Sequence, residues 1–372
     1  MVDALTRASV EGERKESRPA ETAKARAAGS AYIPTLDGWR AIAVALVVVC
    51  HTVGPETPWR DAAGGLGVSI FFGISGYLIC TRLLEEERRA GAISLSKFYV
   101  RRAFRILPPA FAYLAVIVVL GLCGVFRVTI LEILAAAFFF RNYAPGHWYS
   151  GHFWSLAVEE HFYLFFPALL VALGRRRTRW AAIAISLATA VWRVVDTRYG
   201  ILTSHLPEGV YAAARTDFRL DGLMLGCLAA LVFFERPPTR GHRLFAFLPW
   251  ITGALLIANM AHLCPLPELF KAVAIVVMLV SAVWTPGTPL SKALELAPVR
   301  WVGRLSYSLY LWQQLFFVKY PGTEAPSLAW LQRFPLNLVL LLAAATASYY
   351  LLERPMVKVG HRLGKSPVPA RH

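Results

Sequence analysis

The sequence has little charge and few cysteines for its length. Only 17% of its 372 residues are charged, whereas 56% are hydrophobic. A soluble domain of this size needs a more charged surface, so the composition argues against one. The five cysteines are odd in number and scattered, without the Cys-x-x-Cys spacing of zinc sites or redox motifs. We therefore expect no metal site, no disulfide framework and no bound cofactor.

The sequence also lacks a basic helical face of the kind that binds nucleic acid. Its formal charge of +16 comes from 39 Lys and Arg against 23 Asp and Glu. The arginines mostly flank apolar runs, which is typical of the cytoplasmic loops of membrane proteins. We therefore expect membrane lipid as a partner and no nucleic acid.

Apolar runs long enough to cross about 30 Å of hydrocarbon recur along the chain. The predicted spans are 36–54, 66–81, 106–123, 153–173, 180–196, 217–234, 244–263, 267–284, 303–320 and 336–352. No internal repeat is visible. The predicted fold is an all-α polytopic membrane bundle of about ten transmembrane helices, with one membrane domain at 32–356. Residues 1–31 are predicted to be a disordered tail and not a cleavable signal peptide, and 357–372 a basic tail.

The basic clusters indicate how the chain is oriented. The clusters at 82–105, 175–179, 236–243, 292–304 and 354–365 all face the cytoplasm if both termini do. If the short apolar stretch at 128–140 crossed the membrane, the orientation of every later span would be inverted. Its length favours a re-entrant or interfacial segment instead. We expect a multi-pass membrane protein with both termini on the cytoplasmic side.

Ionisable residues inside apolar spans are functional candidates, because such a charge costs about 2.5–3.5 kcal/mol on insertion scales. The first span carries Asp37, Arg40 and His51. Arg40 and His51 are about three helical turns apart, so they share one face roughly 16 Å apart along the axis. Alternatively, Arg40 extends to the inner headgroups and His51 is a hydrogen-bonded interface histidine.

The fourth predicted span adds His152 and Glu159, which lie on one helical face with Ser155 between them. The predicted topology places them level with His51. Because the ordinary pKa of histidine is near 6.5, close to working pH, His51 is a candidate general base. We expect Glu159 to orient and stabilise its imidazole, and we count His152, Arg40 and Asp37 among the candidate catalytic residues.

A further polar cluster, Asp217, Arg219 and Asp221, opens the sixth predicted span at the same expected depth. It could serve the reaction, or Arg219 could simply neutralise the two aspartates. Ser75 lies in Phe71-Phe-Gly-Ile-Ser-Gly-Tyr77, and the chain has no Gly-x-Ser-x-Gly elbow. We interpret Ser75 as a helix-packing residue more readily than as a nucleophile.

Arg102 and Arg105 lie three residues apart at the predicted inner mouth of the third span. Such a pair suits an anionic, phosphate-bearing donor, although an ordinary cytoplasmic flank would look similar. A polyanionic donor at the inner side and a base at the outer side require a long arm between them. Acyl-CoA has that shape and is the expected co-substrate.

Motifs along nearly the whole chain resemble those of acyltransferase family 3, a family of membrane-bound O-acyltransferases. They are Leu36-Asp-Gly-Trp-Arg40 with His51, Phe71-Phe-Gly-Ile-Ser-Gly-Tyr77, Arg101-Arg-Ala-Phe-Arg105, Trp154-Ser-Leu-Ala-Val-Glu-Glu160, Thr216-Asp-Phe-Arg-Leu-Asp221, Gly303-Arg-Leu-Ser-Tyr307 and Glu353-Arg-Pro355. The resemblance implies transfer of an acyl group, commonly acetyl from acetyl-CoA, to a hydroxyl of a carbohydrate or glycolipid acceptor. It implies functional roles for Arg40, His51, Arg102, Arg105 and Glu159. Ser75, Ser306, Tyr307 and the 217–221 cluster are grouped as acceptor-binding or structural polar residues.

Two features depart from this pattern. Many relatives carry a histidine after Leu311-Trp312, where this chain has Gln313, so we expect no acid–base role at that position. We also expect no esterase-like domain of the sort that some relatives carry, so that any second transfer step would require a separate periplasmic transferase partner.

Two rival functions use the same residues. A proton-coupled transporter could employ them as a relay, although the two halves of the chain show no matching pattern. An acyltransferase could instead modify a small secondary metabolite at the cytosolic face. The motifs do not separate these acceptors.

Overall fold

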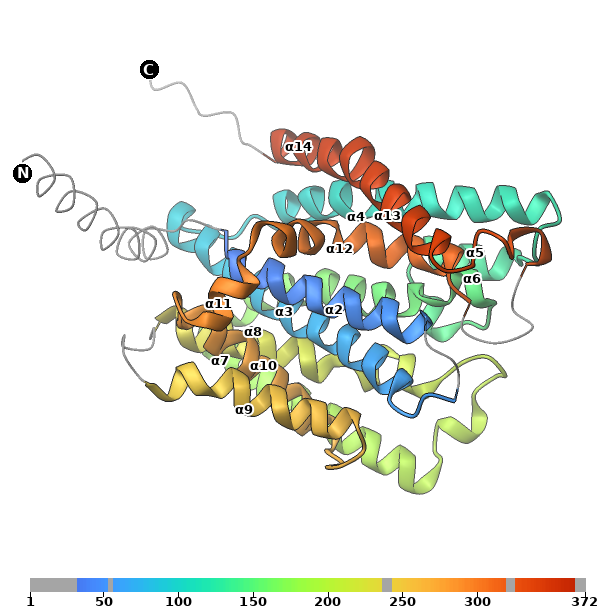
Figure 1. The fold of residues 1–372 in the computed structure, drawn as a ribbon. Coiled ribbons are helices and arrows are strands. Elements are labelled where there is room, and N and C mark those ends of the chain that lie inside the picture. The colour runs from blue at the N-terminus through green and yellow to red at the C-terminus, as the bar shows by residue number, and fades with distance from the viewer. Residues whose placement is uncertain (1–31, 53–55, 236–242, 319–324, 365–372) are drawn as a thin grey trace, which may run out of the picture.

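The computed structural model describes residues 32–52, 56–235, 243–318 and 325–364. Every regular element within them is helical, which confirms the all-α class (Figure 1). The longer helices are α2 (Pro34–Thr52), α3 (Arg60–Ala90), α4 (Leu95–Leu122), α7 (Phe153–Tyr199), α8 (Leu220–Glu235), α9 (Arg243–Met260), α10 (Glu268–Trp284), α12 (Ala297–Phe316), α13 (Leu336–Ser348) and α14 (Arg354–Leu363). The shorter ones are α5 (Ile130–Ala137), α6 (Trp148–Gly151) and α11 (Pro289–Leu294). The predicted N-terminal tail, residues 1–31, and most of the basic C-terminal tail lie outside the described residues.

All ten predicted spans overlap helices, but not all of these helices are long enough to count as spans. Among the described residues, five helical stretches are long and apolar enough to cross a membrane. They are Pro34–Thr52, Arg60–Ala90, Leu95–Leu122, Trp148–Tyr199 and Leu336–Leu363. The structure therefore supports a helical membrane protein, and the count of about ten spans stays a prediction.

The fourth and fifth predicted spans both lie in α7, which bends at Gly174. There the backbone leaves helical geometry, with φ 67° and ψ 169°. Glycine reaches this positive φ at little steric cost, and a kink of this kind lets one long helix change direction. Arg175, Arg176 and Arg177 follow directly, as expected for a turn at the cytoplasmic surface.

The ambiguous stretch at 128–140 contains the eight-residue helix α5. At about 1.5 Å per residue, this helix covers roughly 12 Å, less than half the hydrocarbon thickness. Ile130 and Phe138 at its two ends are largely exposed. These dimensions agree with the prediction of a re-entrant or interfacial segment.

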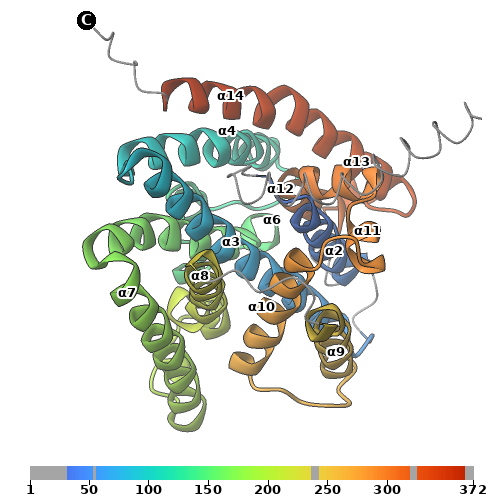
Figure 2. The same cartoon turned by 90° about the vertical axis from the view of Figure 1, so that its left-hand side faces the viewer.

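Glycines bring the central helices into close contact. A Cβ on Gly303 of α12 would lie 1.8 Å from the Asp37 carbonyl oxygen of α2, and one on Gly76 of α3 would lie 2.0 Å from the Leu223 carbonyl oxygen of α8. Small residues allow such approaches between membrane helices. Figure 2 shows α3 near the middle of the bundle and α7, α9 and α14 at its periphery. Gly76, which follows Ser75, therefore has the packing role predicted for this segment.

Candidate active site

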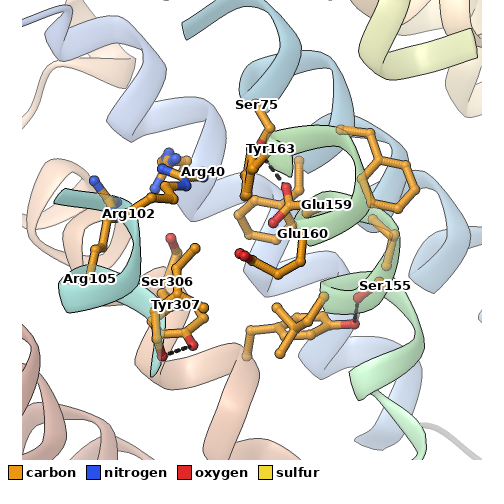
Figure 3. A pocket seen from close by; sticks show the side chains of 16 residues that line it. Arg40, Ser75, Arg102, Arg105, Ser155, Glu159, Glu160, Tyr163, Ser306 and Tyr307 are labelled. Carbon is orange, nitrogen blue, oxygen red and sulfur yellow. Dashed lines mark hydrogen bonds between the residues drawn. The ribbon is translucent and has the colours of Figure 1, made fainter. Parts of the chain in front are cut away.

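A cavity of about 60 Å³ lies among α2, α3, α4, α7 and α12 (Figure 3). Most of the predicted site residues line it, although they come from distant parts of the sequence. The lining polar residues are Arg40, Ser75, Arg102, Arg105, Ser155, Glu159, Glu160, Tyr163, Ser306, Tyr307 and Tyr310. The apolar lining is Val68, Phe71, Phe72, Ile106 and Leu156. A volume of this size holds a few water-sized groups and thus only one end of a large ligand.

Three arginines form the positive side of the cavity. Arg40 comes from α2, and Arg102 and Arg105 come from successive turns of α4. Within the described part of the chain, none of the three forms an ion pair, whereas the neighbouring Arg101 pairs with Glu86 at 2.7 Å. Positive charge without a paired carboxylate favours binding of an anion.

Arg102 is held by an aromatic ring and not by a carboxylate. Its guanidinium carbon lies 3.6 Å from the centre of the Tyr163 ring, a cation–π contact. The Arg102 Nε atom is buried and has no hydrogen-bond partner among the described residues. Arg102 therefore retains hydrogen-bonding capacity for a ligand.

Ser75 and Glu159 meet across the cavity from α3 and α7. The Ser75 hydroxyl donates to Glu159 Oε1 at 2.5 Å, and the Tyr163 hydroxyl donates to Ser75 Oγ at 3.1 Å. Ser75 is thus a member of a polar chain as well as part of a packing motif. Glu160, the next residue on α7, also lines the cavity.

The α12 residues occupy the opposite wall of the cavity. The Tyr307 hydroxyl donates to the Ile106 carbonyl of α4 at 2.8 Å, which fixes α12 against α4. Ser306 Oγ is buried without a hydrogen-bond partner in the described residues. Tyr310 shares a 2.5 Å hydrogen bond with Ser155 at the end of the cavity.

His51 and His152 lie together in a second polar cluster. His51 Nδ1 is 2.7 Å from Gln313 Oε1, and His152 Nδ1 is 2.6 Å from Gln314 Oε1. The Trp148 ring meets the His51 ring edge-on at 5.2 Å. Two consecutive glutamines of α12 therefore hold the two histidines.

Contacts between helices set the order of these clusters along the bundle. Gly303 packs on Asp37 and Gln313 on His51, so α12 runs parallel to α2. Along α12 come first Ser306 and Tyr307, beside the arginine cavity, then Tyr310, then the glutamines. On α7 the order is reversed, with His152 at the histidine end and Glu159 about two turns further into the bundle.

The prediction that Glu159 lies level with His51 is therefore wrong. Glu159 interacts electrostatically with Arg40, and the Ser75 hydroxyl is its hydrogen-bond donor. The position that we assigned to Glu159, beside His51, is instead occupied by Gln313. His152 does lie near His51, as expected, and interacts with it electrostatically.

The remaining predicted residues lie outside the cavity. Asp37 accepts a hydrogen bond from the Tyr32 hydroxyl at 2.6 Å, near the start of α2. Asp221 pairs with Arg193 at 2.5 Å, Asp217 with Arg215 at 3.1 Å, and Arg219 approaches Glu268 at 3.8 Å. The two aspartates thus pair with Arg193 and Arg215, and not with Arg219 as the structural alternative supposed.

Sequence reasoning missed four residues of the two clusters: Glu160, Tyr163, Tyr310 and Gln314. Glu160 and Tyr163 lie beside the chosen Glu159, and a signal was available for both because they belong to the same motif. The signal for Tyr310 and Gln314 was weaker. Tyr310 lies one helical turn after Tyr307, and Gln314 lies one turn after Tyr310, so helical spacing alone placed them on one face.

Comparisons with known proteins agree with this arrangement of motifs. Residues 33–354 match the family model of the acyltransferase domain. A peptidoglycan O-acetyltransferase of Listeria monocytogenes is 30% identical over 320 residues, which cover 76% of this chain and 49% of that protein. A putative O-acetyltransferase of Staphylococcus aureus is 30% identical over 371 residues, or 88% of this chain and 58% of that protein. The chain thus spans about half the length of these relatives. No solved structure matches the chain.

Proposed function

The chain belongs to the acyltransferase family whose domain it matches over residues 33–354, and on this premise we propose that it transfers an acetyl group from acyl-CoA to a hydroxyl of a carbohydrate or glycolipid. The observation that carries the proposal is the cavity with three arginines and no ion pair on any of them among the described residues. The three arginines outnumber the two carboxylates that line the same cavity, Glu159 and Glu160, so the site favours an anionic ligand. The pyrophosphate of acyl-CoA supplies one.

The spacing of the two clusters supports a long donor of this kind. Arg40 and His51 lie on α2 about 16 Å apart along the axis. A donor held by its phosphates at the arginines would need an extended arm to bring its thioester to His51. The pantetheine arm of CoA is flexible and of comparable length.

His51 is the proposed base for the acceptor hydroxyl. Its ring is held at Nδ1 by Gln313, which leaves Nε2 as the nitrogen that takes a proton. The similar protein of Listeria monocytogenes is named for peptidoglycan, a carbohydrate polymer, and this name favours a surface glycan as the acceptor here. No observation favours the transporter.

Mass spectrometry of surface glycans tests the proposed function. Cells with the protein are expected to carry a mass increment of one acetyl group on a glycan hydroxyl, and cells without it are expected to lack that increment. Complementation with the wild-type chain should restore it. Identical glycans in both strains, with the protein present in the membrane, would contradict a glycan acceptor.

We also propose that both termini face the cytoplasm of the inner membrane and that His147 faces outside, because this orientation puts the basic clusters inside. His147 precedes α6 and is 48% exposed, so a cysteine there can react. In a cysteine-free background, His147→Cys is expected to react with a membrane-impermeant maleimide on intact cells, and Arg89→Cys only after permeabilisation. The reverse labelling pattern would overturn the orientation.

A further inference from the structure

Gln313 contacts the proposed base, His51, through its amide oxygen, and its amide nitrogen carries two N–H donors. Its side chain is fully buried, and its Oε1 lies 2.7 Å from His51 Nδ1. An amide oxygen only accepts hydrogen bonds, so His51 Nδ1 must carry the proton in this contact. The lone pair of a neutral His51 is then on Nε2, where a base requires it.

The other end of the same amide has no such contact. Gln313 Nε2 is buried without a hydrogen-bond partner among the described residues. A buried donor without a partner is unfavourable, and in a native protein it calls for an explanation such as a catalytic role. Trp312 Nε1, on the preceding residue of α12, is also buried without a hydrogen-bond partner among the described residues. Both groups are N–H donors, so both can donate to a polar group of a ligand.

We propose that the Gln313 N–H groups bind the carbonyl oxygen of the acyl group and form the oxyanion hole of the transfer reaction. This inference rests on the proposed function and on His51 as its base. Amide donors of glutamine are suited to stabilise a developing oxyanion, because they are preorganised and shielded from water. One side chain thus orients the base and stabilises the charge that the base helps to create.

The acceptor oxygen bonds to the acyl carbon while its proton moves to His51 Nε2, and the carbonyl electron pair moves to the oxygen held by Gln313. When the carbonyl re-forms, the carbon–sulfur bond breaks. The CoA sulfur leaves and takes the proton from the His51 imidazolium, so that the ester, free CoA and neutral His51 remain.

The arginine cavity extends to within one helical turn of Gln313. Tyr310 lines the cavity and lies three residues before Gln313 on α12, a rise of about 5 Å. Its hydroxyl bonds to Ser155 at 2.5 Å, and its ring lies 5.7 Å from the His152 ring. A donor arm that enters past the arginines would have to pass Tyr310 to reach Gln313, which does not itself line the cavity.

The variant Gln313→Glu keeps the contact that orients His51 but removes the N–H donors of the proposed oxyanion hole. The carboxylate still accepts from His51 Nδ1, but it replaces the two N–H donors with an acceptor. We expect kcat for acetyl transfer to fall about 100- to 1,000-fold, as when one donor of an oxyanion hole is removed, with KM for acetyl-CoA close to wild type. Gln332→Glu is the matched control. Gln332 is half-buried, bonds to the Leu315 carbonyl and lies outside both clusters, so this variant should keep wild-type kcat.

A trifluoromethyl-ketone analogue of acetyl-CoA gives a readout that does not depend on turnover. Its hydrate carries a tetrahedral carbon like that of the transition state, so an intact oxyanion hole should bind it more tightly than acetyl-CoA. Gln313→Glu should lose this preference while its affinity for free CoA stays unchanged. If Gln313→Glu keeps both kcat and the preference while His51→Gln is inactive, the oxyanion hole is refuted and the proposed function stands. A wild-type protein without any acetyl-CoA-dependent transfer would refute both.

Discussion

His51→Gln is expected to abolish detectable acetyl transfer. A general base contributes about 100- to 10,000-fold to the rate, and the glutamine amide has no comparable basicity at working pH. The variant should still insert and fold, because an uncharged side chain at this depth adds no insertion cost. Transfer from labelled acetyl-CoA on isolated membranes, at matched protein levels, measures the effect.

The control for this variant is His205→Gln. His205 lies in the short 3-10 helix Thr203–His205 and contacts its own neighbours, Ser204 and the Ile201 carbonyl. Its replacement should leave the rate within about twofold of wild type, as is usual for surface changes of less than 0.5 kcal/mol. Near-normal turnover of His51→Gln would remove the base from the proposed mechanism and leave His51 as a packing residue.

The sequence predicted the helices well because their signal is local. Apolar runs and their basic flanks determine where helices lie in a membrane protein, and each predicted span overlaps a helix. It could also be predicted that Arg102 and Arg105 face the same side, since residues three apart on one helix lie on one face. Both arginines do line the cavity together with Arg40.

The sequence could not predict the depth of one helix relative to another. Periodicity placed His152 and Glu159 on one face of α7, but it did not say which of them would lie level with His51. That level is set by close contacts between helices, such as Gly67 of α3 against the Ala43 carbonyl of α2. The partner of Asp221 was missed for a similar reason, because Arg193 comes from α7 and not from the motif itself.

Arg102→Ala and Arg105→Ala are expected to weaken donor binding, each by about 10- to 150-fold in KM for acetyl-CoA. Each change removes a charge-assisted contact to the donor phosphates, which is worth about 1.5–3 kcal/mol. The effect should appear in KM and in the Kd of free CoA more than in kcat, because the phosphates lie far from the reacting carbon. Lysine replacements should recover only part of the affinity, since an ammonium lacks the planar fork of arginine. At position 102 the lysine would also lose the flat guanidinium contact with Tyr163.

Arg101→Ala is the matched control, because it removes the same charge from the same helix outside the cavity. Arg101 pairs with Glu86 at 2.7 Å and does not line the site. If all three alanine variants changed KM equally, the effect would come from the general positive charge of the inner surface, as in an ordinary cytoplasmic flank. A large effect at 102 and 105 with a small one at 101 would instead indicate direct contacts, because long-range attraction depends little on which of two adjacent charges is lost. Raising the salt concentration separates the two cases further, since screening at about 8–10 Å weakens surface attraction more than contacts in a partly buried cavity.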